Sequence, residues 1–288
     1  MSSVSSDPQG DLTAQAYNLF GYRFAFQTEE PNAARRVDTL YGAFWDESAP
    51  SEATYQLLRN GPEADGAGWS AHLADGEIKT APLLQDALYS VEVGICAEVM
   101  ENTNGRHGIH GAVVYGPGGD LLISGVSGAG KTTLSLALAA RGLRVAGDDA
   151  ALLDPETHLI EALPRNFHLD EHSVSLLEDM GLTLPEEGRR YRFVTPADLG
   201  VVNPPPARIR FVFLLEPERD AQLSIRPQTQ AEMAAALLME TGRGDFTDVE
   251  GVHALSGLIG QADSYRVRSG QLSETADAIV RIVSGRPA

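Results

Sequence analysis

The chain has 288 residues, of which 43% are hydrophobic and 22% are charged, an ordinary composition for a globular protein with one large or two small domains. Its formal net charge of −18 argues against a broad surface for nucleic acid or anionic membranes, because phosphate groups are bound largely by Lys and Arg. A single cysteine, Cys96, excludes an internal disulfide bond, and we interpret it as a small core residue.

Neither a membrane span nor a signal peptide is evident in the sequence. There is no run of about 20 apolar residues, the length that a spanning helix needs. Residues 1–11 are polar and lack the charged and then apolar profile of a signal peptide. We therefore expect a cytoplasmic protein whose partners include neither membrane nor nucleic acid.

Residues 1–80 are expected to form an accessory α+β region. Residues 16–26 are rich in aromatic side chains and predict a strand, and residues 31–45 place apolar side chains at helical spacing. Further strands are predicted at residues 53–58 and 69–73. This part of the sequence contains no phosphate-binding or metal-binding pattern, and we interpret it as a lid, a peptide-recognition surface or a dimer contact.

Residues 81–288 are expected to form an α/β domain. Residues 82–101 carry apolar side chains at three- and four-residue steps, which predicts a helix with a core-facing stripe. Beyond that helix, predicted strands alternate with predicted helices, the pattern of an α/β core. The strands are expected at residues 108–114, 120–124, 143–147, 159–163, 209–215 and 265–267. The helices are expected at residues 132–141, 171–180 and 233–238 and from residue 273 onward.

Residues 125–133 fit the pattern G-x-x-x-x-G-K-[ST], which is typical of phosphate-binding loops. An apolar strand before the loop, and a helix after it that is ended by Gly142, supply the required setting. The glycines let backbone N–H groups surround phosphate oxygens, Lys131 supplies a mobile cation and Thr132 supplies a hydroxyl for Mg²⁺. A glycine-rich turn without a ligand is the alternative. The expected nucleotide-binding residues are Gly125, Ser127, Gly128, Ala129, Gly130, Lys131, Thr132 and Thr133.

Two carboxylates, Asp148 and Asp149, follow the next predicted strand. A right-handed β-α-β crossover lays this strand parallel to the one before the loop, so that both carboxyl ends face one crevice. We expect Asp149, with Thr132, to hold Mg²⁺, and we expect Asp148 to accept the proton of an attacking hydroxyl. A helix cap or a solvated turn is the alternative for this pair.

Residues 108–154 resemble the nucleotide site of HPr kinase/phosphorylase and of phosphoenolpyruvate carboxykinase. Both families have a G-x-S-G-x-G-K-[ST] loop, a paired-Asp motif on the strand after the loop helix, and a His on the strand before the loop. Here His110 takes the position of that His, and residues 116–119 form the hairpin turn that follows. The overall layout resembles the HPr-kinase-related proteins of bacterial peptide-modification clusters.

The sequence also departs from both families. Thr132 and Thr133 follow the loop Lys, as in the carboxykinases, whereas HPr kinases have Ser-Glu there. We find no match to the HPr kinase signature that follows the Asp pair. The chain is far too short for a carboxykinase, and the oxaloacetate-binding residues of that family are not identifiable.

The resemblance implies an α/β fold with a phosphoenolpyruvate carboxykinase/HPr kinase-like P-loop core and a small α+β N-terminal region. It implies transfer of the γ-phosphate of ATP, with Mg²⁺, to a hydroxyl that we expect to be a serine on a protein or peptide. A small-molecule kinase and a non-catalytic nucleotide-sensing module are the alternatives. A GTPase is disfavoured because the sequence lacks an N-K-x-D stretch, and a homo-oligomer is compatible with the sequence. The expected catalytic residues are Asp148, His110, Lys131 and Arg165.

Two of these expectations have structural alternatives. A core or strand-edge histidine is the alternative for His110. A surface arginine is the alternative for Arg165, which we otherwise expect to clamp the transferred phosphate or the acceptor. Residues 188–192 form a dense basic cluster that we interpret as a phosphate lid, an acidic-substrate contact or a solvated loop.

Overall fold

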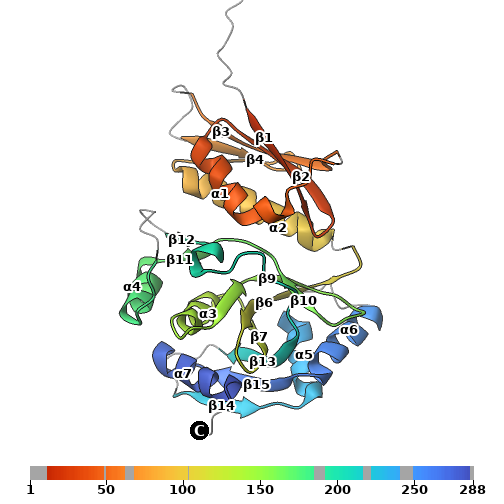
Figure 1. The fold of residues 1–288 in the computed structure, drawn as a ribbon, viewed down its shortest axis with the longest axis vertical. Coiled ribbons are helices and arrows are strands. Elements are labelled where there is room, and N and C mark those ends of the chain that lie inside the picture. The colour runs from red at the N-terminus through yellow and green to blue at the C-terminus, as the bar shows by residue number, and fades with distance from the viewer. Residues whose placement is uncertain are drawn as a thin grey trace, which may run out of the picture. The chain divides into compact units, whose positions relative to one another are not determined.

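The computed structural model describes residues 12–48, 50–61, 68–102, 104–184, 192–216, 222–240 and 249–285. The chain divides into two compact units, Met1–Asn102 and Thr103–Ala288 (Figure 1). Both combine helices with sheets, which confirms the expected α/β class. None of the described helices has the length and the apolar character of a membrane span.

The first unit is a five-stranded sheet with two α-helices. The strands follow their sequence order across the sheet, and only the second and third of them are parallel neighbours within this sheet. The strands are β1 (Thr13–Leu19), β2 (Tyr22–Thr28), β3 (Ala53–Arg59), β4 (Trp69–His72) and β5 (Ile78–Ala81). The helices are α1 (Pro31–Tyr41), followed by a short 3₁₀ helix η1 (Gly42–Phe44), and α2 (Leu84–Glu101).

Aromatic side chains fill the core of the first unit. Every second side chain of β2 is buried, as expected for a strand with one face against helices. The ring of Phe24 lies 5.6 Å from that of Tyr41 on α1 and 5.7 Å from that of Tyr55 on β3, edge-on in both cases. Helix α2 covers the same face, because a Cβ atom at Gly94 would lie 3.3 Å from the Tyr55 ring.

Two expected elements of this unit are corrected. The strand predicted at residues 16–26 is interrupted at Phe20 and Gly21, whose φ angles of 55° and 101° reverse the chain between β1 and β2. The helix predicted at residues 31–45 keeps its α form only to Tyr41, where the chain tightens into η1. Neither change was evident from apolar spacing, which is similar in a hairpin and in a longer strand.

Helix α2 sets the boundary between the two units. Its apolar stripe packs against β3, β4 and β5, so the helix lies within the first unit. The boundary therefore falls after Asn102, whereas we expected it between residues 80 and 81. The amphipathic pattern correctly predicts a buried face but does not say which sheet the face covers.

The second unit is built on a mixed sheet. Its strand order is β10-β9-β6-β7-β13-β15-β14. Strand β8 also pairs with β6, on the part of β6 that follows the part paired with β9. Strands β7, β13 and β15 are parallel neighbours, whereas β6 is antiparallel to both β7 and β8. Because β6 lies between them, β7 and β8 run in the same direction, and their carboxyl ends reach the same edge of the sheet. The strands are β6 (His107–Tyr115), β7 (Asp120–Ser124), β8 (Arg144–Gly147), β9 (Ala150–Leu153), β10 (Ile160–Ala162), β13 (Ile209–Glu216), β14 (Ser224–Pro227) and β15 (Asp263–Arg268).

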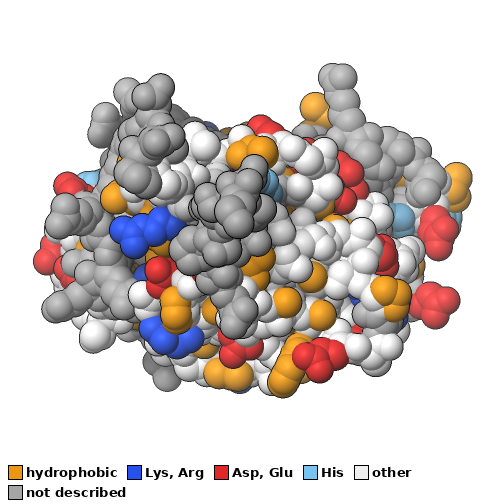
Figure 2. Space-filling view, turned by 90° about the horizontal axis from the view of Figure 1, so that it is seen from above, with side chains coloured by type: hydrophobic (Ala, Val, Ile, Leu, Met, Phe, Trp, Pro, Cys, Tyr) orange, Lys and Arg blue, Asp and Glu red, His pale blue; other side chains and the backbone are white. Residues whose placement is uncertain are grey.

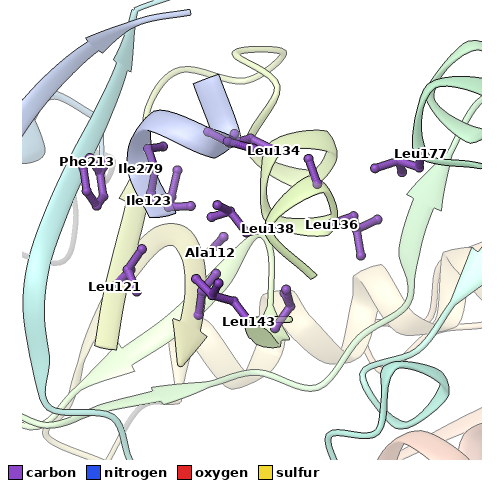
Figure 3. Close-up of a cluster of buried hydrophobic side chains, with 14 of the residues drawn as sticks. Ala112, Leu121, Ile123, Leu134, Leu136, Leu138, Leu143, Leu177, Phe213 and Ile279 are labelled. Atoms are coloured by element: carbon purple, nitrogen blue, oxygen red, sulfur yellow. The ribbon is translucent and has the colours of Figure 1, made fainter. Parts of the chain in front are cut away.

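Helices cover both faces of this sheet (Figure 1). One face packs against α3 (Lys131–Ala139) and α7 (Leu272–Val283), and α4 (Glu171–Asp179) packs in turn against α3. The other face packs against α5 (Gln230–Glu240) and α6 (Val249–Gly260). Figure 3 shows Leu138 of α3 between the sheet residues Ala112 and Ile123, with Leu136 directed toward Leu177 of α4. The remaining described elements are β11 (Phe167–Leu169), β12 (Arg192–Val194) and the 3₁₀ helix η2 (Ala197–Leu199).

Helix α6 was not predicted from the sequence. It contains Gly251, Gly257 and Gly260, and glycine disfavours a helix interior. At Gly257 the absence of a side chain has a packing reason, because a Cβ atom there would lie 2.3 Å from the ring of His158. Tertiary packing therefore overrides a weak local preference in this segment.

The charged side chains are mixed on the visible surface. On the face drawn in Figure 2, apart from the grey residues, acidic and hydrophobic side chains are interspersed. Lys and Arg form small groups there rather than a continuous surface. The drawn face therefore has no broad basic surface, as expected for a chain with a formal net charge of −18.

We expect Gly118→Ala to lower the free energy of unfolding by roughly 1–3 kcal/mol, the range for overpacking in a rigid site. Gly118 lies in the β6–β7 turn, where an added Cβ atom would come within 1.8 Å of the Val283 carbonyl oxygen of α7. Urea unfolding measures the effect. Gly260→Ala is the matched control, because an added Cβ atom there meets nothing within 4 Å. Equal stabilities of the two variants would contradict the expected clash.

Candidate active site

The loop between β7 and α3, residues 125–130, is the glycine loop of the sequence motif. Gly125 and Gly130 have φ angles of 150° and 89°, in the range that favours glycine. A Cβ atom at Gly125 would lie 2.7 Å from the Leu215 carbonyl oxygen, so the loop passes close to β13. A Cβ atom at Gly128 or Gly130 would meet nothing within 4 Å, and the outer side of the loop is therefore accessible.

The start of α3 closes the glycine loop. Gly130 precedes the helix without a side-chain cap, so the first backbone N–H groups of α3 receive no capping hydrogen bond from that residue. Uncapped N–H groups and the positive end of the helix dipole together favour an anion at this point. Val126, Ser127 and Gly128 are exposed beside it, whereas Ala129 is half-buried.

The Lys131 amine is hydrogen-bonded to the backbone of the glycine loop. It donates to the carbonyl oxygens of Gly125 at 2.8 Å and Val126 at 3.2 Å. It also lies 2.9 Å from Nε2 of His110, which reaches the same place from β6. Residue Lys131 is only 6% exposed, so its charge is directed at the loop and not at bulk solvent.

Pairing with β6 positions the two carboxylates. The ladder between β6 and β8 shifts register at Val113/Val114, an irregularity of the kind that redirects the side chains that follow. The backbone leaves the regular ladder at Asp148 and Asp149 and rejoins β6 at Ala150, and the Gly111 N–H donates to the Asp149 carbonyl oxygen at 3.0 Å. The predicted strand therefore does not end at the pair but resumes as β9.

Asp148 faces the helix that follows the loop. Its Oδ2 accepts a hydrogen bond from the Thr132 hydroxyl at 2.5 Å, and the residue is 5% exposed. Burial raises the pKa of the Asp148 carboxyl to about 6, although the Thr132 hydrogen bond and the charge of Arg165 oppose this rise. Its buried Oδ1 makes no hydrogen bond within the described part of the chain.

Asp149 faces the other way. Its Oδ1 lies 3.2 Å from His110 Nδ1, and its Oδ2 accepts a hydrogen bond from Arg165 Nη1. Arg165 follows β10, which pairs with β9 and so runs back alongside the Asp pair. The side chains of Asp149 and His110 are 38% and 32% exposed, so a ligand can reach them from solvent.

These contacts determine the tautomer of His110. A lysine ammonium can only donate, so Nε2 of His110 must accept its hydrogen bond. The ring proton then lies on Nδ1 and points to Asp149. The ring thus contacts Lys131 and Asp149, and its carboxylate partner is not Asp148, the proton acceptor expected from the sequence.

The pairing of carboxylates with partners differs from the sequence-based assignment. We expected Thr132 and Asp149 to act together on Mg²⁺, but the Thr132 hydroxyl contacts Asp148. A buried carboxylate oxygen without a hydrogen bond, beside a hydroxyl, fits a divalent cation better than the Arg-bound Asp149 does. The described residues contain no cluster of three or more His, Cys, Asp or Glu suited to a metal ion. Mg²⁺ at phosphate sites needs only one or two protein oxygens besides phosphate and water.

The Thr133 hydroxyl and the His168 imidazole also lie near this region. The Thr133 hydroxyl lies 3.4 Å from the Ser173 hydroxyl of α4, so this side chain faces α4. His168 on β11 was not predicted; burial and, as a smaller contribution, the charge of Arg165 together lower its pKa to about 4. The only sequence signal for His168 is its position three residues after Arg165. Most of the basic cluster at residues 188–192 lies outside the described residues.

No family model matches the sequence, and no curated protein matches it. Among solved structures, the chain is similar to the Hpr(Ser) kinase/phosphatase from Coxiella burnetii, with 14% sequence identity and a TM-score of 0.29. The similarity covers 61% of this chain and 88% of that one. At this TM-score the similarity carries no argument about fold or activity.

Proposed function

We propose that the protein is an ATP- and Mg²⁺-dependent kinase that transfers the γ-phosphate to a hydroxyl group. One observation carries the proposal: three chemically distinct parts converge at the start of α3. They are the Lys131 amine under the glycine loop, the Thr132–Asp148 pair, and the chain of contacts from His110 through Asp149 to Arg165. A module that only senses nucleotide needs the glycine loop but does not need the contacts from His110 through Asp149 to Arg165.

Each part has a separate role in the proposed reaction. The N–H groups of the loop and of α3, together with Lys131, bind the phosphates of ATP. Thr132 and Asp148 would hold Mg²⁺, which when bound would offset the negative charge of the phosphates. Asp148 thus takes the Mg²⁺-binding role that we assigned to Asp149 from the sequence. Arg165 places a positive charge beside Asp149, where it can align the acceptor and the transferred group.

We propose that the acceptor is a serine on a protein or peptide, as the resemblance of residues 108–154 to HPr kinases implies. The half-exposed His110 and Asp149 are compatible with any hydroxyl that can approach them. A small-molecule hydroxyl therefore remains an outcome of the test.

Calorimetric titration with ATP, run once with Mg²⁺ and once with EDTA, tests the binding part of the proposal. Transfer of labelled γ-phosphate to seryl peptides and to small alcohols tests the reaction. Binding followed by transfer supports the kinase and identifies the acceptor class. Binding without transfer or phosphate release would instead indicate a nucleotide-sensing module, and no binding would refute both.

We expect Thr132→Val to reduce the effect of Mg²⁺ on ATP affinity and to slow transfer by roughly 10²-fold, the scale for one lost electrostatic contact at the reacting group. Valine keeps the β-branched shape of Thr132 but removes the hydroxyl that contacts Asp148. Thr275→Val is the matched control, because the buried Thr275 hydroxyl donates to the backbone carbonyl of Gln271, the residue before α7. The assignment fails if both variants keep wild-type Mg²⁺ dependence.

A further inference from the structure

We propose that Nε2 of His110 takes the proton of the acceptor hydroxyl, and that the Lys131 amine covers this atom until bound phosphates draw the amine away. The inference rests on the proposed kinase function and names the proton acceptor of that site. It also couples the availability of this proton acceptor to the presence of the phosphate donor.

The Lys131 ammonium group has three protons to donate. They face three acceptors: the Gly125 oxygen at 2.8 Å, the Val126 oxygen at 3.2 Å and His110 Nε2 at 2.9 Å. A phosphate oxygen can accept from this amine only by replacing one of these contacts. The arrangement therefore makes phosphate binding a competition for the amine.

A bound phosphate is expected to replace the contact between Lys131 and His110. An anionic phosphate oxygen is a stronger acceptor for an ammonium group than a neutral imidazole nitrogen or a carbonyl. The two carbonyls belong to the glycine loop, which is the structure expected to surround the phosphates. His110 comes from β6, and its ring is held independently of the loop. Movement of the Lys131 amine toward phosphates bound by the glycine loop would thus separate it from His110 Nε2.

Once Lys131 has moved away, Asp149 and Arg165 determine which nitrogen of His110 carries the proton. Asp149 holds the Nδ1 side, and Arg165 in turn holds the second oxygen of Asp149. The ring would therefore keep its proton on Nδ1 and present the Nε2 lone pair. A carboxylate that fixes an imidazole in this way is the arrangement that prepares a histidine to act as a general base. Asp149 and Arg165 are positioning residues in this scheme.

The reaction step follows from these positions. The acceptor oxygen forms a bond to the γ-phosphorus of ATP, and the bond from that phosphorus to the bridging oxygen breaks. ADP leaves with the electron pair of the broken bond, and the hydroxyl proton moves to Nε2 of His110. The ring later returns this proton to solvent, so His110 is regenerated.

The reactivity of His110 toward diethyl pyrocarbonate, located by mass spectrometry, tests the covering of Nε2. We expect ADP to make His110 react roughly tenfold faster, about the factor contributed by one hydrogen bond to a charged group. Lys131→Met should give the fast rate without ADP and no response to ADP. His253, exposed on α6, serves as the internal reference. An unchanged or slower rate with ADP, or a slow rate in Lys131→Met, would overturn the proposal.

ADP affinity measured by calorimetry provides a second test. His110→Phe keeps a planar ring but removes the acceptor that competes for Lys131, so we expect ADP to bind roughly tenfold tighter. His253→Phe is the matched control and should leave the affinity unchanged. Weaker or equal affinity in His110→Phe would show that the amine does not leave His110. Failure of the wild-type protein to bind ADP would instead refute the proposed function, so the two failures are distinguishable.

Discussion

Lys131→Met is expected to reduce ATP affinity by at least roughly 10²-fold and to eliminate transfer, because several charge-assisted hydrogen bonds to phosphate are lost together. The fold should persist. Methionine fills a similar volume, and the carbonyls that lose a donor belong to the glycine loop, where Val126 is exposed. Calorimetry measures the affinity, and circular dichroism with urea unfolding checks the fold.

The composition of the chain offers a matched control for this variant. The sequence contains two lysines, Lys131 and Lys79. Lys79 lies on β5 of the first unit, where its 42% exposed side chain pairs with Glu77 at 3.4 Å. An exposed pair of this kind contributes little to stability, so Lys79→Met should leave both binding and fold unchanged. Wild-type ATP affinity in a folded Lys131→Met protein would refute phosphate binding by the glycine loop.

The sequence predicted the local parts of the site well. The order of strand, glycine loop and helix depends on short patterns: an apolar run, glycines at fixed spacing and a helical stripe. The parallel direction of β8 relative to β7 followed from the β-α-β crossover that joins them, although β6 lies between them. These features are set by interactions within about 30 residues of chain, the length of a β-α-β unit.

The partners of the two carboxylates could not be predicted in the same way. Whether Asp148 or Asp149 faces Thr132 depends on how β8 and β9 pair with β6, including the register shift at Val113/Val114. A change of one residue in register reverses the side of the strand on which a side chain lies. Adjacent identical residues give no pattern from which to choose between the two arrangements.

Long-range packing accounts for the other differences. Arg165 reaches Asp149 because β10 returns alongside β9, and the sequence alone left a surface position equally open. Helix α2 joins the first unit because its apolar stripe fits the sheet of β3, β4 and β5. In both cases the residue type was informative, but the partner came from contacts between distant segments.

Asp148→Asn is expected to stabilise the protein at pH 7.5 while slowing transfer by roughly 10²-fold or more, because it removes the charge proposed to hold Mg²⁺; this combination is typical of a site selected for function. Burial raises the pKa of the Asp148 carboxyl from 3.8 to about 6, so the folded state holds this proton more tightly than the unfolded state does. The contribution of this group to stability is therefore greatest below about pH 4, and it falls as the pH rises to about 6. Asparagine carries no charge, so the gain should be roughly 1–3 kcal/mol at pH 7.5 and should vanish near pH 4.

Urea unfolding of the wild type and the variant across this pH range measures the difference, and the neighbouring residue provides the contrast. Asp149 is bound by His110 and Arg165, so Asp149→Asn removes the carboxylate from a partly buried guanidinium and should destabilise the protein at pH 7.5. Added Mg²⁺ with ATP should raise the stability of the wild type more than that of Asp148→Asn, because the variant lacks the charge proposed to hold the cation. A variant that is less stable than the wild type at pH 7.5 would mean that Asp148 is stabilised by partners as a carboxylate. The orphaned Oδ1 would then have a structural explanation, and the metal-binding role of Asp148 would lose its main support.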